Sequence, residues 1–156
     1  MGAFMKLAEA LVLRADVQRR IEQLRANVKQ SALVQEGEQP PEDPQALLSQ
    51  LDGLFDQLTD LIIRINKTNM LTVMPGGGIM TEALAQRDVL SLRYRIISEL
   101  ANTAADRTDR YGRSEIRKIA TVDVAVLREQ ATDLARQRRE LDTAIQALNW
   151  ATDLAE

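Results

Sequence analysis

The chain has 156 residues, 45% of them hydrophobic and 3% aromatic, and its 20 Lys and Arg residues against 23 Asp and Glu residues give a formal net charge of -3. This length and hydrophobic content suit a single domain with a real core, and the interleaving of the two charge signs disfavours a nucleic-acid-binding protein, which normally shows a basic patch. The chain has no histidine and no cysteine, so disulfides, thiolate catalysis and cysteine-based zinc or iron–sulfur sites are excluded.

The first half of the chain predicts two long helices. Apolar residues recur at three-and-four spacing over residues 6–35, which predicts a helix of about 30 residues. Residues 36–42 contain one glycine and two prolines and predict a linker. Asp43 followed by Pro44 predicts the start of the second helix, because aspartate caps a helix N-terminus and proline suits its first turn. The second helix carries the most regular apolar stripe of the chain: Leu47, Leu51, Leu54, Leu58, Leu61 and Ile65.

The middle of the chain predicts an excursion between helices. Residues 66–69 are polar and close the second helix, and residues 70–80 contain two short apolar runs around Pro75 and three glycines. This pattern predicts a small two-stranded β-ribbon. Thr81 is the expected cap of a third helix that extends to about Asp106.

The second half of the chain predicts a basic segment and a last helix. Residues 107–119 are polar and basic, and residues 115–121 are compatible with another strand or an extended arm. Contact of this arm with nucleic acid is disfavoured by the acidic balance of the whole chain. Asp123 is the expected cap of a fourth helix that reaches about Trp150.

Four helices and two excursions predict an all-α fold, either a long-helix four-helix bundle or extended helical hairpins, with coiled-coil-like packing and a small β-ribbon excursion. Helices of about 25 to 30 residues are much longer than the globular average of about a dozen. Long helices with wide apolar stripes often continue their packing into a neighbouring subunit, so a homo-oligomer is expected.

Arginines interrupt the apolar stripes of three predicted helices. Arg14 falls in the series of the first helix and Arg138 in that of the fourth, and Arg87 or Arg93 falls on the apolar face of the third, depending on register. A buried guanidinium needs a carboxylate partner. The candidate partners are Glu9, Asp16, Asp60, Asp88 and Asp142.

Two interpretations of these arginines remain open. They can form ion pairs that fix helix register or a subunit interface, or they can converge into a pocket that grips the phosphate or carboxylate of an anionic small molecule. Residues 75–78 do not form a phosphate-binding loop, because the Gly-Lys-Ser/Thr ending is missing. Metal sites of helical bundles depend on Glu-x-x-His pairs, which this chain cannot supply. Neither a metal nor a cofactor is therefore expected, and an all-carboxylate magnesium or calcium site is the one alternative left open, although no helix–loop–helix calcium loop is visible.

Several short blocks spread over the chain are distinctive. They are residues 5–11 (MKLAEAL), 14–16 (RAD), 20–24 (RIEQL), 36–38 (EGE), 65–69 (INKTN), 81–88 (TEALAQRD), 111–116 (YGRSEI), 121–124 (TVDV) and 149–150 (NW). On these blocks the chain resembles a family of small, uncharacterised bacterial proteins that are often labelled septicolysin. The resemblance implies a start near Met5, so residues 1–4 are expected to be a cloning remnant or an upstream start, and residues 5–156 a single helical domain.

Three functional hypotheses follow. The leading one is a non-catalytic helical protein that acts through self-association and protein contacts, since no nucleophile–base pair is recognisable; enzymatic activity stays uncertain. The second is a binder of an anionic small molecule. The third is membrane activity, which the septicolysin label implies but which low aromatic content disfavours. With no apolar run near 18 residues and no signal-peptide pattern, a cytoplasmic location without a membrane partner is expected.

Overall fold

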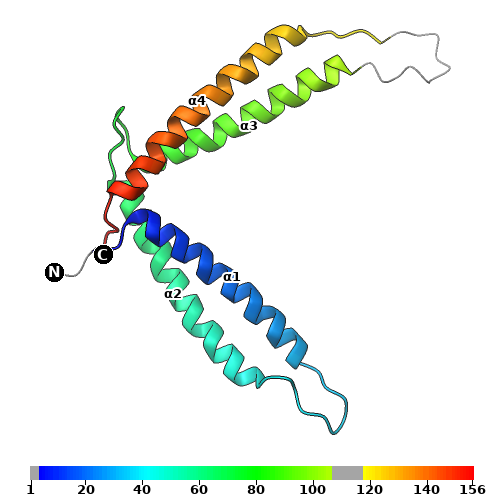
Figure 1. Cartoon of the computed structure of the whole chain (residues 1–156), viewed down its shortest axis with the longest axis vertical. Coiled ribbons are helices and arrows are strands. Elements are labelled where there is room, and N and C mark those ends of the chain that lie inside the picture. Colours follow the sequence, from blue (N-terminus) through cyan, green and yellow to red (C-terminus); the bar gives the residue numbers. More distant parts are fainter. Residues whose placement is uncertain (1–3, 107–117) are drawn as a thin grey trace. The chain divides into compact units, whose positions relative to one another are not determined.

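The computed structural model describes residues 4–106 and 118–156. Over these residues the chain forms long α-helices, which are α1 (Leu7–Ser31), α2 (Pro44–Leu71), α3 (Met80–Ala105) and α4 (Val124–Ala151) (Figure 1). The all-α prediction is confirmed. Most of the expected basic segment, residues 107–117, and the first part of the arm predicted at 115–121 lie outside the described residues.

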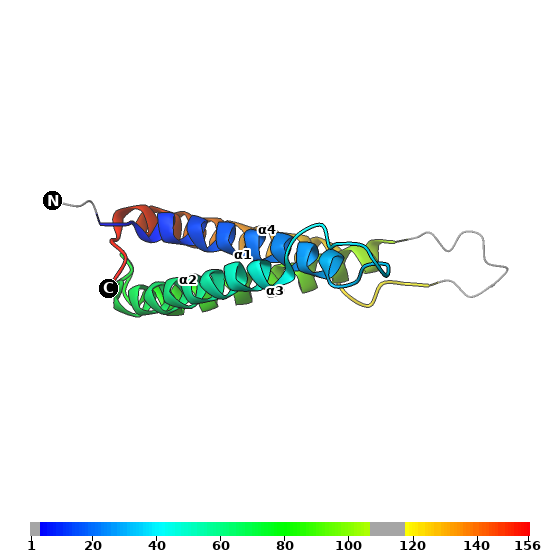
Figure 2. The same cartoon turned by 90° about the horizontal axis from the view of Figure 1, so that it is seen from below.

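The chain divides into two compact units. The first contains α1, α2 and residues 146–156, and the second contains residues 74–145, with α3 and most of α4. Each unit is built around one pair of helices that lie side by side in both views (Figures 1 and 2). The expectation of a single domain over residues 5–156 stays a prediction.

The core of the first unit lies between α1 and α2. Its buried residues come from the three-and-four series of both helices and from the end of the chain: Leu7, Ala10, Val17, Leu54, Leu61, Ile65 and Leu154. The helix starts are fixed by carboxylates, as local chemistry requires. The Gln45 N–H donates to Asp43 Oδ1 at 3.0 Å, which confirms the predicted cap of α2. At α1 the Lys6 N–H donates to Glu9 Oε2 at 2.7 Å.

The residues that follow α4 are docked onto the first unit. The Leu154 side chain is only 4% exposed and belongs to the core. Its N–H donates to the Met5 carbonyl at 2.8 Å, and the Leu7 N–H donates to the Thr152 carbonyl at 2.9 Å. The Lys6 ammonium adds an ion pair with Asp153 at 2.6 Å. The Ala155 N–H also donates to Thr68 Oγ1 near the end of α2. This terminal segment, residues 152–156, is called the strap, and it packs on the start of α1 and the end of α2.

The second unit is a hairpin of α3 and α4. Its buried apolar residues are small or unbranched on α3 and mixed on α4: Met80, Ala83, Ala101, Ala131, Leu134 and Ile145. The Val126 N–H donates to Asp123 Oδ1 at 3.1 Å, which confirms the predicted cap of α4. The buried residues of α3 are small apart from Met80, so α3 contributes little apolar volume to this core.

The structure shows no strands where the ribbon is expected, at residues 70–80, but only single bridge positions at Val73 and Ile79. Helix α2 continues to Leu71 and α3 begins at Met80, and the intervening residues make a tight turn in which the Met74 N–H donates to the Gly78 carbonyl at 3.0 Å. Residues at both ends of the expected ribbon therefore belong to helices instead of strands. Gly77 and Gly78 have φ values of 92° and 78°, a conformation that favours glycine.

The expected cap of α3 is also wrong by two residues. Ile79, rather than Thr81, is the capping position, and its N–H donates to Glu82 Oε2 at 3.1 Å. The glutamate in the first turn does the work that sequence analysis assigned to the threonine hydroxyl, since a carboxylate at that position reaches back to the free N–H group.

Candidate functional site

Arg87 is the best-paired of the predicted arginines. Its side chain is half-buried on α3, with Nη1 3.1 Å from Asp142 Oδ1 on α4 and Nη2 3.7 Å from Asp88 Oδ1. Both carboxylates are among the partners expected from sequence. The hydrogen bond to Asp142 ties α3 to α4, and the two carboxylates beside Arg87 disfavour the binding of an anion there. Because Asp142 is partly exposed, we expect this ion pair to contribute about 1 kcal/mol or less to stability.

The other predicted arginines do not join Arg87. Arg14 is half-buried in the first unit and has no ion pair with the described residues, since Asp16 contacts Arg19 instead. Arg93 and Arg138 are exposed on α3 and α4. Within each unit, the described residues therefore bring together only Arg87, Asp88 and Asp142. A guanidinium can reach solvent along its apolar stem, so an interrupted stripe does not by itself make a buried charge.

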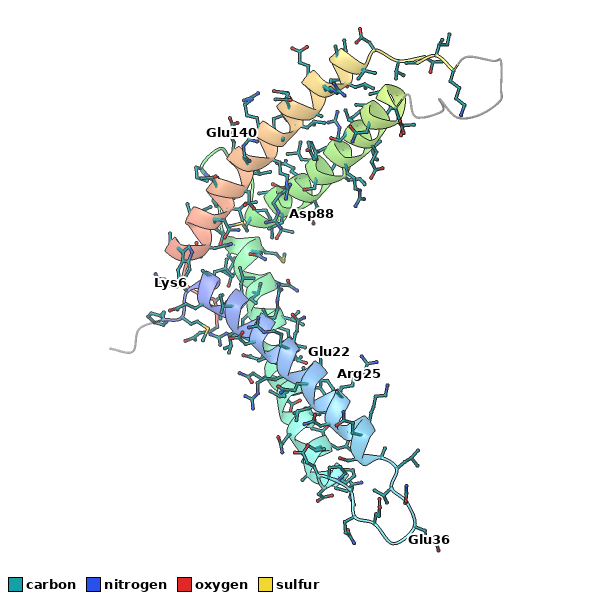
Figure 3. The ribbon with its side chains drawn as sticks, turned by 45° about the vertical axis from the view of Figure 1, so that its right-hand side comes forward. Lys6, Glu22, Arg25, Glu36, Asp88 and Glu140 are labelled. Atoms are coloured by element: carbon teal, nitrogen blue, oxygen red, sulfur yellow. The ribbon has the colours of Figure 1, made fainter. Side chains whose placement is uncertain are left out.

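A network of exposed ion pairs and hydrogen bonds runs along α4. Asp133 accepts from Arg136 Nη2 at 2.5 Å and from Gln137 Nε2 at 2.7 Å, and Arg136 Nη1 donates to Glu140 at 3.2 Å. The hydrogen bond from Arg136, followed by that from Gln137, lowers the pKa of the Asp133 carboxyl below its ordinary value. Glu140 lies on α4 (Figure 3). These are three- and four-residue spacings on one helix, which are typical of a solvated face.

A cavity of about 350 Å³ lies in the second unit beside the glycine turn. It is lined by residues 74–79, by Glu82, Ala83 and Gln86 of α3, and by Leu141 and Ala144 of α4. Glu82 is its only charged lining residue, and that carboxylate already accepts from the Ile79 N–H. A cavity edged by a carboxylate does not suit an anion.

The described part of the chain contains no group of three or more acidic side chains placed to hold a metal ion. In the same residues, none of the helices combines the length and the apolar character that crossing a bilayer requires.

The most distinctive surface feature is an apolar stripe on α3 that sequence analysis missed. Val89, Leu92, Ile96 and Leu100 are between 41% and 55% exposed. Successive residues of a helix turn by about 100°, which puts this stripe well away from Ala83 and Ala101, the residues buried toward α4. We call Ala85, Val89, Leu92, Ile96 and Leu100 the outer stripe of α3. Its three-and-four spacing is visible in the sequence, but this spacing alone does not show which of two apolar faces of a helix is buried.

A second exposed stripe lies on α2. Leu48, Phe55 and Ile62 follow one another at seven-residue spacing and are 42%, 47% and 38% exposed. They flank the buried series that contains Leu51 and Leu54. The wide stripe predicted for this helix is therefore only partly used within the first unit. Part of the apolar face of each helical hairpin remains in contact with solvent.

Comparisons with known proteins place this fold in a family without fixing a function. A comparison with curated proteins found no match. The crystal structure of a functionally unknown conserved protein from Corynebacterium diphtheriae is similar, with 42% sequence identity, a TM-score of 0.92, and coverage of 98% of this chain and 100% of that one. Residues 14–154 match a family described as a family of unknown function, DUF6847. Since the match covers most of the chain, this protein belongs to that family.

Proposed function

We propose that this protein acts by self-association, with copies joined through the apolar residues that its helical hairpins leave exposed. The outer stripe of α3 is the observation that carries the proposal. Four branched side chains in a row on one face of a helix form an apolar patch, and such patches mark interaction surfaces when they are contiguous. Isolated exposed leucines would carry no such meaning.

The energetics of the outer stripe alone come close to balancing the cost of association. Burying an exposed Val, Leu or Ile fully is worth about 1.5 to 3 kcal/mol. Because the stripe residues are already about half covered, a partner helix gains roughly half of this for each, or about 3 to 6 kcal/mol per stripe. Two stripes facing each other gain about 6 to 12 kcal/mol, which is comparable with the association cost of about 4 to 15 kcal/mol.

The stripe of Leu48, Phe55 and Ile62 on α2 is a second apolar surface, in the first unit. A single helix stripe is near the threshold for stable pairing, and this second stripe offers a further surface for self-association. The seven-residue spacing on α2 is the one that coiled-coil packing requires. A protein whose helices present such seams in both units is suited to a structural or adaptor role rather than to catalysis.

Sedimentation velocity over about 1 to 100 µM protein tests the proposal, a range that brackets micromolar affinity. We expect a discrete oligomer whose population falls on dilution. Leu92→Gln together with Ile96→Gln should shift the protein towards the monomer. Ile63→Gln, at an exposed apolar position outside both stripes, is the control and should leave the distribution unchanged. A wild-type monomer over the whole range would overturn the proposal.

A further inference from the structure

The outer stripe of α3 has the spacing of a coiled-coil seam. Ala85, Val89, Leu92 and Ile96 follow one another at intervals of four, three and four residues, and the next position is Glu99, where the seam ends. This alternation keeps one edge of a helix facing a partner helix over successive turns. The seam lies on one helix of the second unit, and its four residues are exposed rather than buried in the core of that unit.

We infer that the seam is covered by the α3 helix of a second copy, packed antiparallel about a two-fold axis. This inference rests on the proposed self-association and names its geometry. In the corresponding register, Val89 lies beside the partner's Leu92 and Ala85 lies beside the partner's Ile96. Each layer then combines a smaller side chain with a larger one, whereas a parallel pair would set Ala85 against its own copy and leave a gap.

The charges that flank the seam match the same register. Asp88 and Arg95 occupy equivalent positions one heptad apart on the same edge of the seam, and both are exposed. In an antiparallel pair this edge meets its own copy, so Asp88 comes beside the partner's Arg95, and the two-fold axis repeats the contact. Flanking charges of this kind set the orientation of helix pairs. Figure 3 shows Asp88 on α3.

Helix dipoles favour the same orientation. The two N-termini of a parallel pair would lie together, as would the two C-termini, which is unfavourable, whereas an antiparallel pair sets each end beside its opposite. The remaining contact of Asp88 within the chain, the 3.7 Å approach to Arg87, is too long to satisfy the carboxylate. Asp88 therefore has acceptor capacity left for the partner's guanidinium.

A charge swap tests the register. Asp88→Arg and Arg95→Asp each create two like-charge contacts across the axis and should each weaken association about tenfold or more at low salt. The double variant restores opposite charges and should return the affinity to within about threefold of the wild type. The control exchanges Glu22 and Arg25, an exposed pair on α1, and should have no effect. An oligomer indifferent to all these charges would overturn the register while leaving self-association intact.

A disulfide test fixes the orientation independently, because the chain has no cysteine of its own. Val89→Cys and Leu92→Cys proteins are mixed under mild oxidation and the products are identified by mass. An antiparallel pair yields mainly the mixed 89–92 disulfide, since these positions face each other across the axis. A parallel pair yields 89–89 and 92–92 products instead, and that result overturns the inference. A wild-type monomer in the sedimentation experiment overturns both the inference and the proposed function.

Discussion

The hydroxyl of Thr68 offers the sharpest test of how the end of the chain is held. This side chain is 2% exposed; its Oγ1 donates to the Arg64 carbonyl at 2.7 Å and accepts from the Ala155 N–H at 2.9 Å. Thr68→Val keeps the shape and removes both hydrogen bonds. The Ala155 carbonyl still accepts from Arg64 Nε at 3.0 Å, so the strap stays near its place with an N–H group that has lost its acceptor.

The expected cost follows from that lost acceptor. The Arg64 carbonyl keeps its backbone helical bond, so losing the hydroxyl there matters little. A buried N–H without a partner costs about 1 to 3 kcal/mol, which is the destabilisation expected for Thr68→Val. Thr68→Ser keeps the hydroxyl and loses one methyl group, for which about 1 kcal/mol is expected. The control is Thr59→Val, because Thr59 makes the same bond to the residue four positions earlier, the Phe55 carbonyl, but is exposed and has no strap partner.

Urea unfolding followed by circular dichroism measures these differences at one fixed protein concentration, so that any self-association contributes equally. Hydrogen exchange at the Ala155 amide should speed up in Thr68→Val and stay near the wild-type rate in Thr59→Val. If Thr68→Val were as stable as Thr59→Val, the hydroxyl would not be holding the strap. If Thr68→Ser were the less stable of the two Thr68 variants, the methyl group rather than the hydrogen bond would dominate.

Three further outcomes are expected. Leu154→Ala should destabilise the protein by about 2 to 3 kcal/mol, whereas Leu33→Ala, at an 89% exposed position, should change stability by less than about 0.5 kcal/mol in the same unfolding assay. Carbon-detected NMR titration should give Asp133 a pKa below the ordinary aspartate value of 3.8, and Arg136→Gln should raise it; because folding lowers this pKa, its contribution to stability is present above the unfolded-state pKa and is lost as pH falls through the folded-state pKa. Gly78→Ala should lower the melting temperature, since φ is 78° there and an added Cβ would lie 2.7 Å from a carboxylate oxygen of the α3 cap.

Local chemistry made the helices predictable. The caps at Asp43 and Asp123 were found because a carboxylate reaches N–H groups two or three residues away, a distance that the sequence alone fixes. The expected ribbon is not seen because α2 extends through the polar stretch at residues 66–69 to Leu71. The hydroxyls of Thr68 and Thr72 donate to carbonyls four residues earlier, so these polar side chains are accommodated along the helix instead of ending it at residue 66.

The strap could not be predicted because the contacts that dock it onto α1 and α2 are distant in sequence. The hydrogen bond between Ala155 and Thr68 joins residues 87 positions apart. Leu154 is a single apolar residue beyond the last periodic segment, and periodicity needs several residues to be recognised. The pairing of the arginines could not be predicted for the same reason, because it depends on residues that are distant in sequence. The pattern located Arg14, Arg87 and Arg138 on interrupted stripes, but only the paired helix decides whether a carboxylate such as Asp142 stands opposite.

The two faces of α3 show what a single-helix pattern leaves undetermined. Leu90 and Ile97 are half-buried, whereas Val89 and Ile96, their immediate neighbours along the chain, are exposed. Such adjacent apolar pairs place apolar residues on two faces of one helix. The sequence does not show which face packs within the chain and which is free to contact another molecule. The flanking charges are what distinguishes the proposed antiparallel pair from the alternatives. On one edge of the outer stripe Asp88 and Arg95 have opposite signs at heptad spacing, an arrangement that gives no ion pair within one helix and would give two ion pairs across a two-fold axis. The charge-swap and disulfide experiments therefore test the assignment of this edge of α3 to a second copy.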